Sequence, residues 1–319
     1  MTDPVPFDVF MDDALYGPSG FYSGGAGPGR RGADFLTSPE IGPLFGAVVA
    51  RALDAWWDQL GRPESFPVVE AAAGRGALAT AIARAEPRCA AVMRYVMVER
   101  SSANRNADAL DDLPDPGALG DVGVVFANEL LDNLPFKLLE RVGKQWRELL
   151  VDGDAFVIGD AVDAFGHVDA PDGARIPWHT HAIEWVGRAR ALFARSRVVL
   201  VDYGTPTTAE LAARPWRDWL RTYRDHGMGK DPLRHPGEQD ITCDVGFDQL
   251  GPDRLNPQAD WLRGYGIDGL VAAARATWTE RAAIGDLEAL AARSRVNEAA
   301  ALLDPDGPGS FLVAEWLQA

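Results

Sequence analysis

Residues 67–76 read Pro-Val-Val-Glu-Ala-Ala-Ala-Gly-Arg-Gly and form the most informative segment of this 319-residue chain. A short apolar strand ends on Glu70, a loop of small residues follows, and a helical pattern begins at Ala77. Small residues let the backbone turn sharply and approach a ligand, and the free amides at a helix N-terminus supply donors and positive potential. The segment is therefore typical of a nucleotide-type cofactor site.

The carboxylate of Glu70 at the strand end narrows the choice of cofactor. It favours a hydroxyl-bearing, positively charged partner over a pyrophosphate, and S-adenosylmethionine is such a partner. Residues 74–79 also satisfy the dinucleotide pattern G-x-G-x-x-A, and Glu99 lies about where an acid would bind the ribose of a dinucleotide. The loop alone does not decide between three interpretations: a site for a methyl donor, a site for a dinucleotide, and a glycine turn without a ligand.

The charge and cysteine content limit the partners and the compartment. Lys and Arg number 31 and Asp and Glu 47, a formal net charge of −16 that opposes adhesion to nucleic acid or an anionic membrane, so we expect neither as a partner. Cys89 and Cys243 are the only cysteines, which favours a reducing cytoplasm. Residues 1–7 lack the pattern of a signal peptide, and no apolar run reaches membrane-spanning length, so we expect a soluble protein.

Strands and helices alternate from residue 66 onward. Strands are predicted at 67–71, 94–99, 122–127 and 198–202, and helices at 75–85, 101–110, 129–133 and 179–194. The alternation predicts a parallel, doubly wound α/β sheet, closed by a last strand at 311–316 after a helical stretch near 269–301. We divide the chain into an N-terminal helical cover (1–65), a Rossmann-like cofactor-binding core (66–204), a large insertion over the active-site edge (205–265), and C-terminal helices with the closing strand (266–319).

The predicted cover contains a glycine-rich loop at 24–29 and a helix over 41–56. Thr37-Ser-Pro-Glu40 is the capping box expected to start this helix. Within the insertion, Trp216, Trp219 and Tyr223 are spaced to share one helical face. Packing of these rings under extended arginines is therefore favoured over a single-stranded nucleic-acid platform.

Two further strand ends carry polar residues. Glu99 can accept hydrogen bonds from both hydroxyls of a ribose, or it can cap the helix predicted after it. After the strand at 122–127, Asn128, Glu129 and Asp132 follow within five positions, and a pair of acids can orient a cationic nucleophile and accept its proton. The alternative is that Asn128 caps a short helix in which Asp132 is a solvated acid.

Two other groups of residues have open interpretations. Tyr203 follows a buried strand, and two interpretations of its side chain are open. It could close over a substrate, or it could be a core tyrosine whose hydroxyl has a hydrogen-bond partner. His179 and His181 could share a strand face, but no nearby third ligand completes a set, and we predict no metal site.

A set of short motifs spans most of the chain. They are Leu15-Tyr16-Gly17, Gly20-Phe-Tyr22, Asp34-Phe-Leu-Thr37-Ser38-Pro39-Glu40-Ile41, Glu70-Ala-Ala-Ala-Gly74-Arg-Gly76, residues 95–99, Ala127-Asn128-Glu129-Leu-Leu-Asp132-Asn-Leu-Pro135, Asp202-Tyr203-Gly204 and Gly237-Glu-Gln-Asp240-Ile-Thr242. Together they resemble the MidA-type methyltransferases, which depend on S-adenosylmethionine and include the mitochondrial arginine methyltransferase that assists assembly of respiratory complex I. The resemblance implies a Rossmann-like class I methyltransferase fold.

The resemblance also implies roles for the motif residues. The residues that would hold the cofactor are Thr37, Ser38, Glu40, Glu70, Ala72, Gly74, Gly76, Glu99 and Asn128. The residues that would line the methyl-transfer site are Asn128, Glu129, Asp132 and Tyr203. The implied acceptor is an arginine side chain on a partner protein, and a homodimer is a further expectation.

The chain departs from the family pattern at Ala72, where the family has glycine. A methyl group there would crowd the cofactor or change the turn if the position needs positive φ. A non-catalytic assembly or scaffold protein with a degenerate pocket is therefore the main alternative. A nicotinamide-dependent oxidoreductase is a weaker one, because nothing downstream supplies an obvious hydride-transfer acid.

Overall fold

The computed structural model describes residues 3–23, 37–224, 227–229 and 231–318. Within these residues the core is a six-stranded sheet in which three parallel pairings join four adjacent strands, the last of which forms one edge of the sheet. In spatial order the strands are β15 (Arg254–Pro257), β16 (Leu312–Gln318), β9 (Arg195–Asp202), β4 (Val122–Asn128), β2 (Phe66–Ala71) and β3 (Met93–Val98). The predicted doubly wound α/β sheet with its closing C-terminal strand is confirmed, and β16 runs antiparallel to β9.

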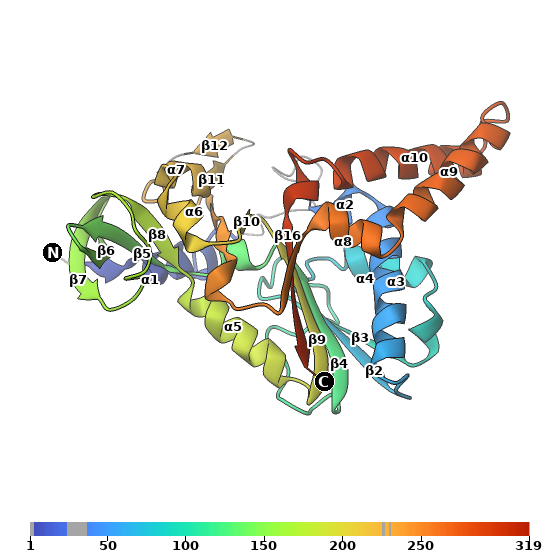
Figure 1. The fold of residues 1–319 in the computed structure, drawn as a ribbon, viewed down its shortest axis with the longest axis horizontal. Coiled ribbons are helices and arrows are strands. Elements are labelled where there is room, and N and C mark those ends of the chain that lie inside the picture. The colour runs from blue at the N-terminus through green and yellow to red at the C-terminus, as the bar shows by residue number, and fades with distance from the viewer. Residues whose placement is uncertain (1–2, 24–36, 225–226, 230, 319) are drawn as a thin grey trace.

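Helices cover both faces of this sheet, as Figure 1 shows. Alternate residues of the central strands point to opposite faces, so Val68 and Val69 enter two different hydrophobic clusters. One face packs against α5 (Thr180–Ala191). The other packs against α3 (Pro43–Gln59), α4 (Ala77–Arg84), α8 (Gln258–Gly264), α9 (Ile267–Arg281) and α10 (Leu287–Leu302).

A second, antiparallel sheet lies at the opposite end of the molecule from the α9–α10 hairpin (Figure 1). Its strands are β1 (Val5–Pro6), β5 (Lys137–Val142), β6 (Gln145–Asp152), β7 (Ala155–Val162) and β8 (Arg175–Trp178). Helix α1 (Phe7–Tyr16) packs on it through Phe7, which contacts Phe136 and Phe156. The N-terminal segment is thereby fixed beside the carboxyl edge of the core sheet.

The predicted insertion contributes small sheets and short helices. These elements are β10 (Gly204–Thr205), α6 (Thr208–Ala212), α7 (Trp216–Trp219), β11 (Leu220–Arg224), β12 (Gly227–Gly229), β13 (Asp240–Cys243), β14 (Val245–Gly246) and η3 (Phe247–Gln249). The single helical face predicted for Trp216, Trp219 and Tyr223 is wrong, because the chain turns into β11 at Leu220. β11 pairs with both β12 and β13, and that tertiary pairing overrides the helical spacing.

Two other local predictions are corrected. The helix predicted at 101–110 does not form, since this stretch is rich in Ser, Asn and Asp, whose side chains compete for backbone groups, and only turns and a bridge between Val98 and Leu110 appear. The capping box at Thr37 is present, but it starts the four-residue helix α2 (Ser38–Ile41), which Gly42 separates from α3. The loop predicted at 24–29 lies outside the described residues.

Among the described residues, no helix combines the length and the apolar character needed to cross a bilayer.

Candidate functional site

The loop between β2 and α4 has an unusual backbone. Ala72, Gly74 and Gly76 have φ values of 53°, 49° and 80°, all in the left-handed region that favours glycine. A Cβ at Gly76 would lie 3.0 Å from Sδ of Met97, so glycine allows this turn to approach β3. Ala72 occupies a position that does need positive φ, at a cost of about 1–2 kcal/mol for an L-residue.

Glu99 and Glu70 face the space above this loop. The carboxylate of Glu99 accepts hydrogen bonds from the amides of Gly74 (2.9 Å) and Ser101 (2.8 Å), which fix its orientation without a helix to cap. Glu70 is 5% exposed and accepts a hydrogen bond from the hydroxyl of Tyr95 at 2.8 Å. Burial, with the nearby charge of Glu99, raises the pKa of Glu70 to about 8. A bound cation would favour the ionised form of Glu70.

These side chains line a cavity of about 630 Å³ at the carboxyl ends of β2, β3 and β4, which we call the cofactor cavity. Its volume lies in the range of small-molecule sites, roughly 300–1,000 Å³. Of the predicted cofactor residues, the cavity is lined by Thr37, Glu40, Glu70, Ala72, Gly74, Glu99 and Asn128. Ser38 and Gly76 do not line the cavity, although the amide of Ser38 donates to the carboxylate of Glu129 at 3.4 Å.

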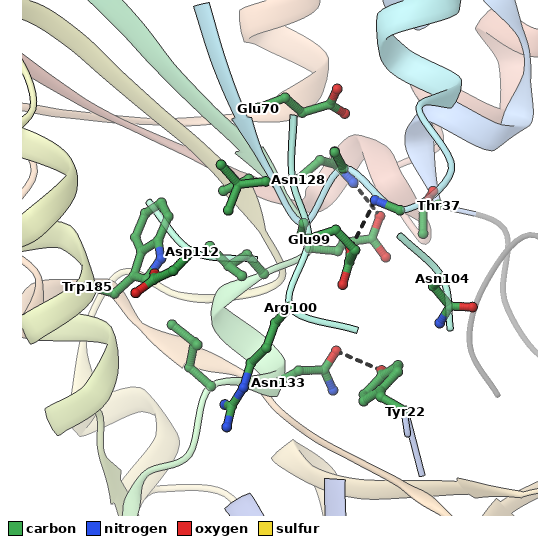
Figure 2. Close-up of a pocket in the computed structure, with 18 of the residues that line it drawn as sticks. Tyr22, Thr37, Glu70, Glu99, Arg100, Asn104, Asp112, Asn128, Asn133 and Trp185 are labelled. Atoms are coloured by element: carbon green, nitrogen blue, oxygen red, sulfur yellow. Dashed lines mark hydrogen bonds between the residues drawn. The ribbon is translucent and has the colours of Figure 1, made fainter. Parts of the chain in front are cut away.

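Other parts of the cavity wall carry no local sequence signal. Figure 2 shows Trp185 and Asp112 on one side of the pocket, opposite Thr37 and Asn104. Trp185 comes from α5, whose amphipathic pattern indicates only packing. Its flat ring suits contact with the nucleobase of a cofactor. Asp112 lies beside it and forms an ion pair with Arg188 at 2.7 Å. Arg100, also in the wall, was missed for the same reason, whereas Tyr22 belongs to the motif at residues 20–22 but was given no role there.

The end of β4 holds a strained backbone and an unpaired polar atom. Glu129 has a φ of 53°, and its amide donates to the carbonyl of Val201 at 2.8 Å. The side-chain amide of Asn128 donates to Oε1 of Glu129 at 2.8 Å, whereas its Oδ1 is buried without a partner among the described residues. An orphaned acceptor of this kind fits an ammonium donor such as the amino group of S-adenosylmethionine.

The capping interpretation of this segment is wrong. The short helix η2 (Leu131–Asn133) has no side-chain cap, and Asp132 is 4% exposed rather than solvated. Asp132 accepts a hydrogen bond from the hydroxyl of Tyr203, and its Oδ1 is buried and unpaired in the part of the chain described. Asp202 fixes η2 by accepting from the amides of Leu131 (2.7 Å) and Asp132 (3.3 Å).

Burial changes the acidity of both acids at this strand end. Burial raises the pKa of Glu129 to about 8, and the charge of Asp132 adds to the shift. Burial also raises the pKa of Asp132 to about 6, against the opposing effects of the Tyr203 hydrogen bond and the charge of Arg221. Both carboxyl groups therefore exchange protons near neutral pH, which suits proton transfer.

A second cavity, of about 470 Å³, lies on the other side of Glu129, and we call it the acceptor cavity. It shares four lining residues with the cofactor cavity: Tyr22, Thr37, Glu129 and Asn133. Asp132 and Tyr203 line it, as do residues that the sequence did not assign to a site: Arg221, Tyr223, Asp240, Thr242, Asp244 and Phe311. The motif at residues 237–242 was a signal for two of these, although its role could not be inferred.

The two histidines lie in separate environments, and His181 is one of the residues that line the cofactor cavity. Nε2 of His179 accepts from the amide of Gly246 at 3.1 Å, and burial lowers the pKa of His179 to about 3. His181 lies in the first turn of α5 and faces Asp8 at 3.6 Å, so the shared strand face expected for the pair is wrong. In the described ranges, no group of three His, Cys, Asp or Glu side chains could hold a metal ion.

Comparison with known proteins places this geometry in context. A family model described as "Putative S-adenosyl-L-methionine-dependent methyltransferase" matches residues 48–254. A crystal structure from Burkholderia thailandensis bound to S-adenosyl-homocysteine is 28% identical, with a TM-score of 0.79 over 98% of this chain and 88% of that chain. These findings confirm the predicted family and its cofactor, S-adenosylmethionine, and favour a methyl donor over a dinucleotide.

Curated relatives match over much of the chain. The protein arginine methyltransferase NDUFAF7 homolog of Drosophila melanogaster is 27% identical, and the match covers 77% of this chain and 65% of the relative, just under two thirds of its length. The human protein arginine methyltransferase NDUFAF7 is 27% identical, and the match covers 84% of this chain and 71% of the relative.

These names correct one prediction. The relatives are mitochondrial proteins, so the cytoplasmic location predicted from the cysteine content is wrong. Two unpaired cysteines indicate a reducing environment, and that property does not identify a compartment.

Proposed function

Because the chain belongs to the family of S-adenosyl-L-methionine-dependent methyltransferases, we propose that it methylates a nitrogen of an arginine side chain on a partner protein. The names of the curated relatives support arginine as the acceptor. The observation that carries the proposal is the shared wall at Glu129, with a cofactor cavity on one side and an acid-lined cavity on the other.

In this proposal the cofactor cavity holds S-adenosylmethionine, which supplies an electrophilic methyl group on a sulfonium. Glu99 would accept hydrogen bonds from the ribose hydroxyls, because backbone amides already hold its two oxygens in place. Glu70 and the unpaired Oδ1 of Asn128 suit the cationic amino acid end. Residues 37–40 and the loop at 72–76 complete the pocket.

In the acceptor cavity the acids would orient the substrate and remove its proton. A guanidinium stays protonated in water, so a proton must leave as the new carbon–nitrogen bond forms and the carbon–sulfur bond breaks. Asp132 and Glu129 are the proposed proton acceptors, with Tyr203 orienting Asp132 through its hydroxyl. Asp132 is buried and Glu129 is half-buried, which limits the competition of water for the same hydrogen bonds.

Transfer of labelled methyl groups from S-adenosylmethionine into a lysate of the producing cell tests the proposal. We expect label on arginine of a protein, identified by mass spectrometry, and calorimetric titration should show saturable binding of S-adenosyl-homocysteine. A labelled small molecule would overturn the protein substrate. An absence of saturable binding would instead support the assembly-protein alternative that Ala72 keeps open.

A further inference from the structure

We propose that Asp240 is the specificity-determining carboxylate of the acceptor cavity, selecting a cationic side chain and directing its reactive nitrogen toward Glu129 and Asp132. The inference rests on the proposed function and deepens it. Asp240 is the first residue of β13 and belongs to the motif at residues 237–242, which the cofactor site leaves unused.

Side chains from two distant segments hold Asp240 in place. Its Oδ1 accepts hydrogen bonds from the hydroxyl of Tyr22 and from the side-chain amide of Asn133, each at 3.1 Å. The same amide of Asn133 donates to the carbonyl of Ile241 at 3.1 Å, which ties η2 to β13. Asp240 is 7% exposed and lines the same cavity as Asp132 and Glu129. Its position relative to the proposed proton acceptors is therefore fixed by the fold.

The hydrogen-bond partners of Asp240 leave its charge uncompensated. Among the described residues these partners are neutral, whereas Asp244 in the same cavity is paired with Arg214 (2.9 Å) and Arg221 (2.6 Å). Burial, with the charge of Asp132, raises the pKa of Asp240 to about 7. A cation bound between these acids would relieve their repulsion, and a neutral isostere of the same shape would not.

The chain already shows how this cavity holds a guanidinium. Arg221 donates to Asp244 while its guanidinium carbon lies 5.2 Å from the ring centre of Tyr203. Tyr203 in turn packs against Phe311, with ring centres 5.4 Å apart. A carboxylate and an aromatic face together suit a planar cation, and Asp240 offers the second carboxylate beside the same aromatic wall.

The test measures discrimination between a cation and its neutral isostere. Two pools of short peptides with randomised flanks, one with central arginine and one with central citrulline, are titrated into the S-adenosyl-homocysteine complex of each variant. We expect the wild type to bind the arginine pool at least about tenfold more tightly. Asp240→Asn should bring the ratio of the Kd values for the citrulline and arginine pools close to one, and its affinity for S-adenosyl-homocysteine should stay within about twofold of wild type.

Asp218→Asn is the matched control, because it removes one negative charge from an exposed site in the insertion outside both cavities. It should keep the wild-type ratio. If Asp240→Asn does not fold, Tyr22→Phe removes one hydrogen bond to Asp240 and should lower the ratio by a smaller factor.

Equal binding of the two pools by the wild type, or an unchanged ratio in the variant, would overturn the role of Asp240. The proposed function fails by a separate result, namely a wild-type protein that binds no S-adenosyl-homocysteine and transfers no methyl group.

Discussion

Glu99 in the cofactor cavity and two acids of the acceptor cavity are held in different ways. In the cofactor cavity, backbone amides of neighbouring strand ends fix Glu99. In the acceptor cavity, side chains from distant segments hold Asp132 and Asp240. Backbone donors persist whatever side chains surround them, whereas side-chain donors are lost with a single substitution. The position of Glu99 in the cofactor cavity therefore depends on the backbone of the fold. The positions of Asp132 and Asp240 in the acceptor cavity depend on particular side chains.

The largest expected effect is the loss of activity on substitution of Asp132, which should affect the acceptor cavity and not the cofactor cavity. Asp132→Asn keeps the shape of the side chain and removes the proton acceptor, so kcat for methyl transfer should fall about 100- to 10,000-fold. Affinity for S-adenosyl-homocysteine should stay within about threefold, because Asp132 does not line the cofactor cavity. Radiolabel transfer and calorimetry measure the two quantities. A parallel loss of cofactor affinity would show that the cavities act as one site.

The converse variant, Glu99→Ala, should act on the cofactor side. It removes the carboxylate proposed to bind both ribose hydroxyls and leaves the amides of Gly74 and Ser101 without their partner. Two charge-assisted hydrogen bonds correspond to a roughly 100-fold weaker Kd for S-adenosyl-homocysteine. At saturating cofactor, kcat should recover most of its wild-type value. Glu64→Ala, at an exposed position, is the control, and an equal loss of affinity there would discredit the ribose role.

The same contrast explains what could be predicted from the sequence. Glu70, Gly74 and Glu99 lie at or just after the carboxyl ends of apolar strands. Because parallel strands bring these ends to the same edge of the sheet, local sequence patterns predict the cofactor cavity. Nothing local brings Tyr22 to Asp240, since 218 positions separate them and their contact depends on the packing of α1 and β13. Likewise, β11 forms a strand because it pairs with β13, and the local spacing of residues does not indicate this pairing.

The dependence of stability on pH should report on both cavities. Glu70, Asp132, Asp240 and Glu129 have folded-state pKa values of about 8, 6, 7 and 8, above the roughly 4 of unfolded carboxyl groups. The fold therefore favours their protonated forms, and this contribution to stability is fully present below about pH 4 and is lost as pH rises from there to each folded-state pKa. The free energy of unfolding of the ligand-free protein should fall by on the order of 1 kcal/mol per pH unit for each group that is still protonated in the folded state but ionised in the unfolded chain.

Urea denaturation between pH 5.5 and 8.5 measures this slope. Glu70→Gln, in the cofactor cavity, should flatten it over the whole range up to about pH 8, and Asp240→Asn, in the acceptor cavity, only up to about pH 7, because the contribution of each acid ends at its folded-state pKa. Unchanged slopes in both variants would contradict the assignment of buried, protonated acids.

The smallest expected effect concerns Ala72, where the cofactor loop departs from glycine. Ala72→Gly relieves left-handed strain of about 1–2 kcal/mol, but glycine loses about 0.5–1 kcal/mol through its freer unfolded chain. We expect a net stabilisation of at most about 1 kcal/mol. Removal of the methyl group from the cavity wall should also tighten S-adenosyl-homocysteine binding by about threefold, an effect of under 1 kcal/mol.

Glu86→Gly is the matched control for Ala72, because Glu86 has a similar φ of 49° and follows α4 outside both cavities. It should stabilise the fold to a similar degree and leave cofactor affinity unchanged. Tighter binding in Ala72→Gly alone would show that the methyl group crowds the cofactor. If both variants gain stability and neither changes affinity, the cavity accommodates the methyl group, and the degenerate-pocket alternative loses the only departure from the family pattern on which it rests.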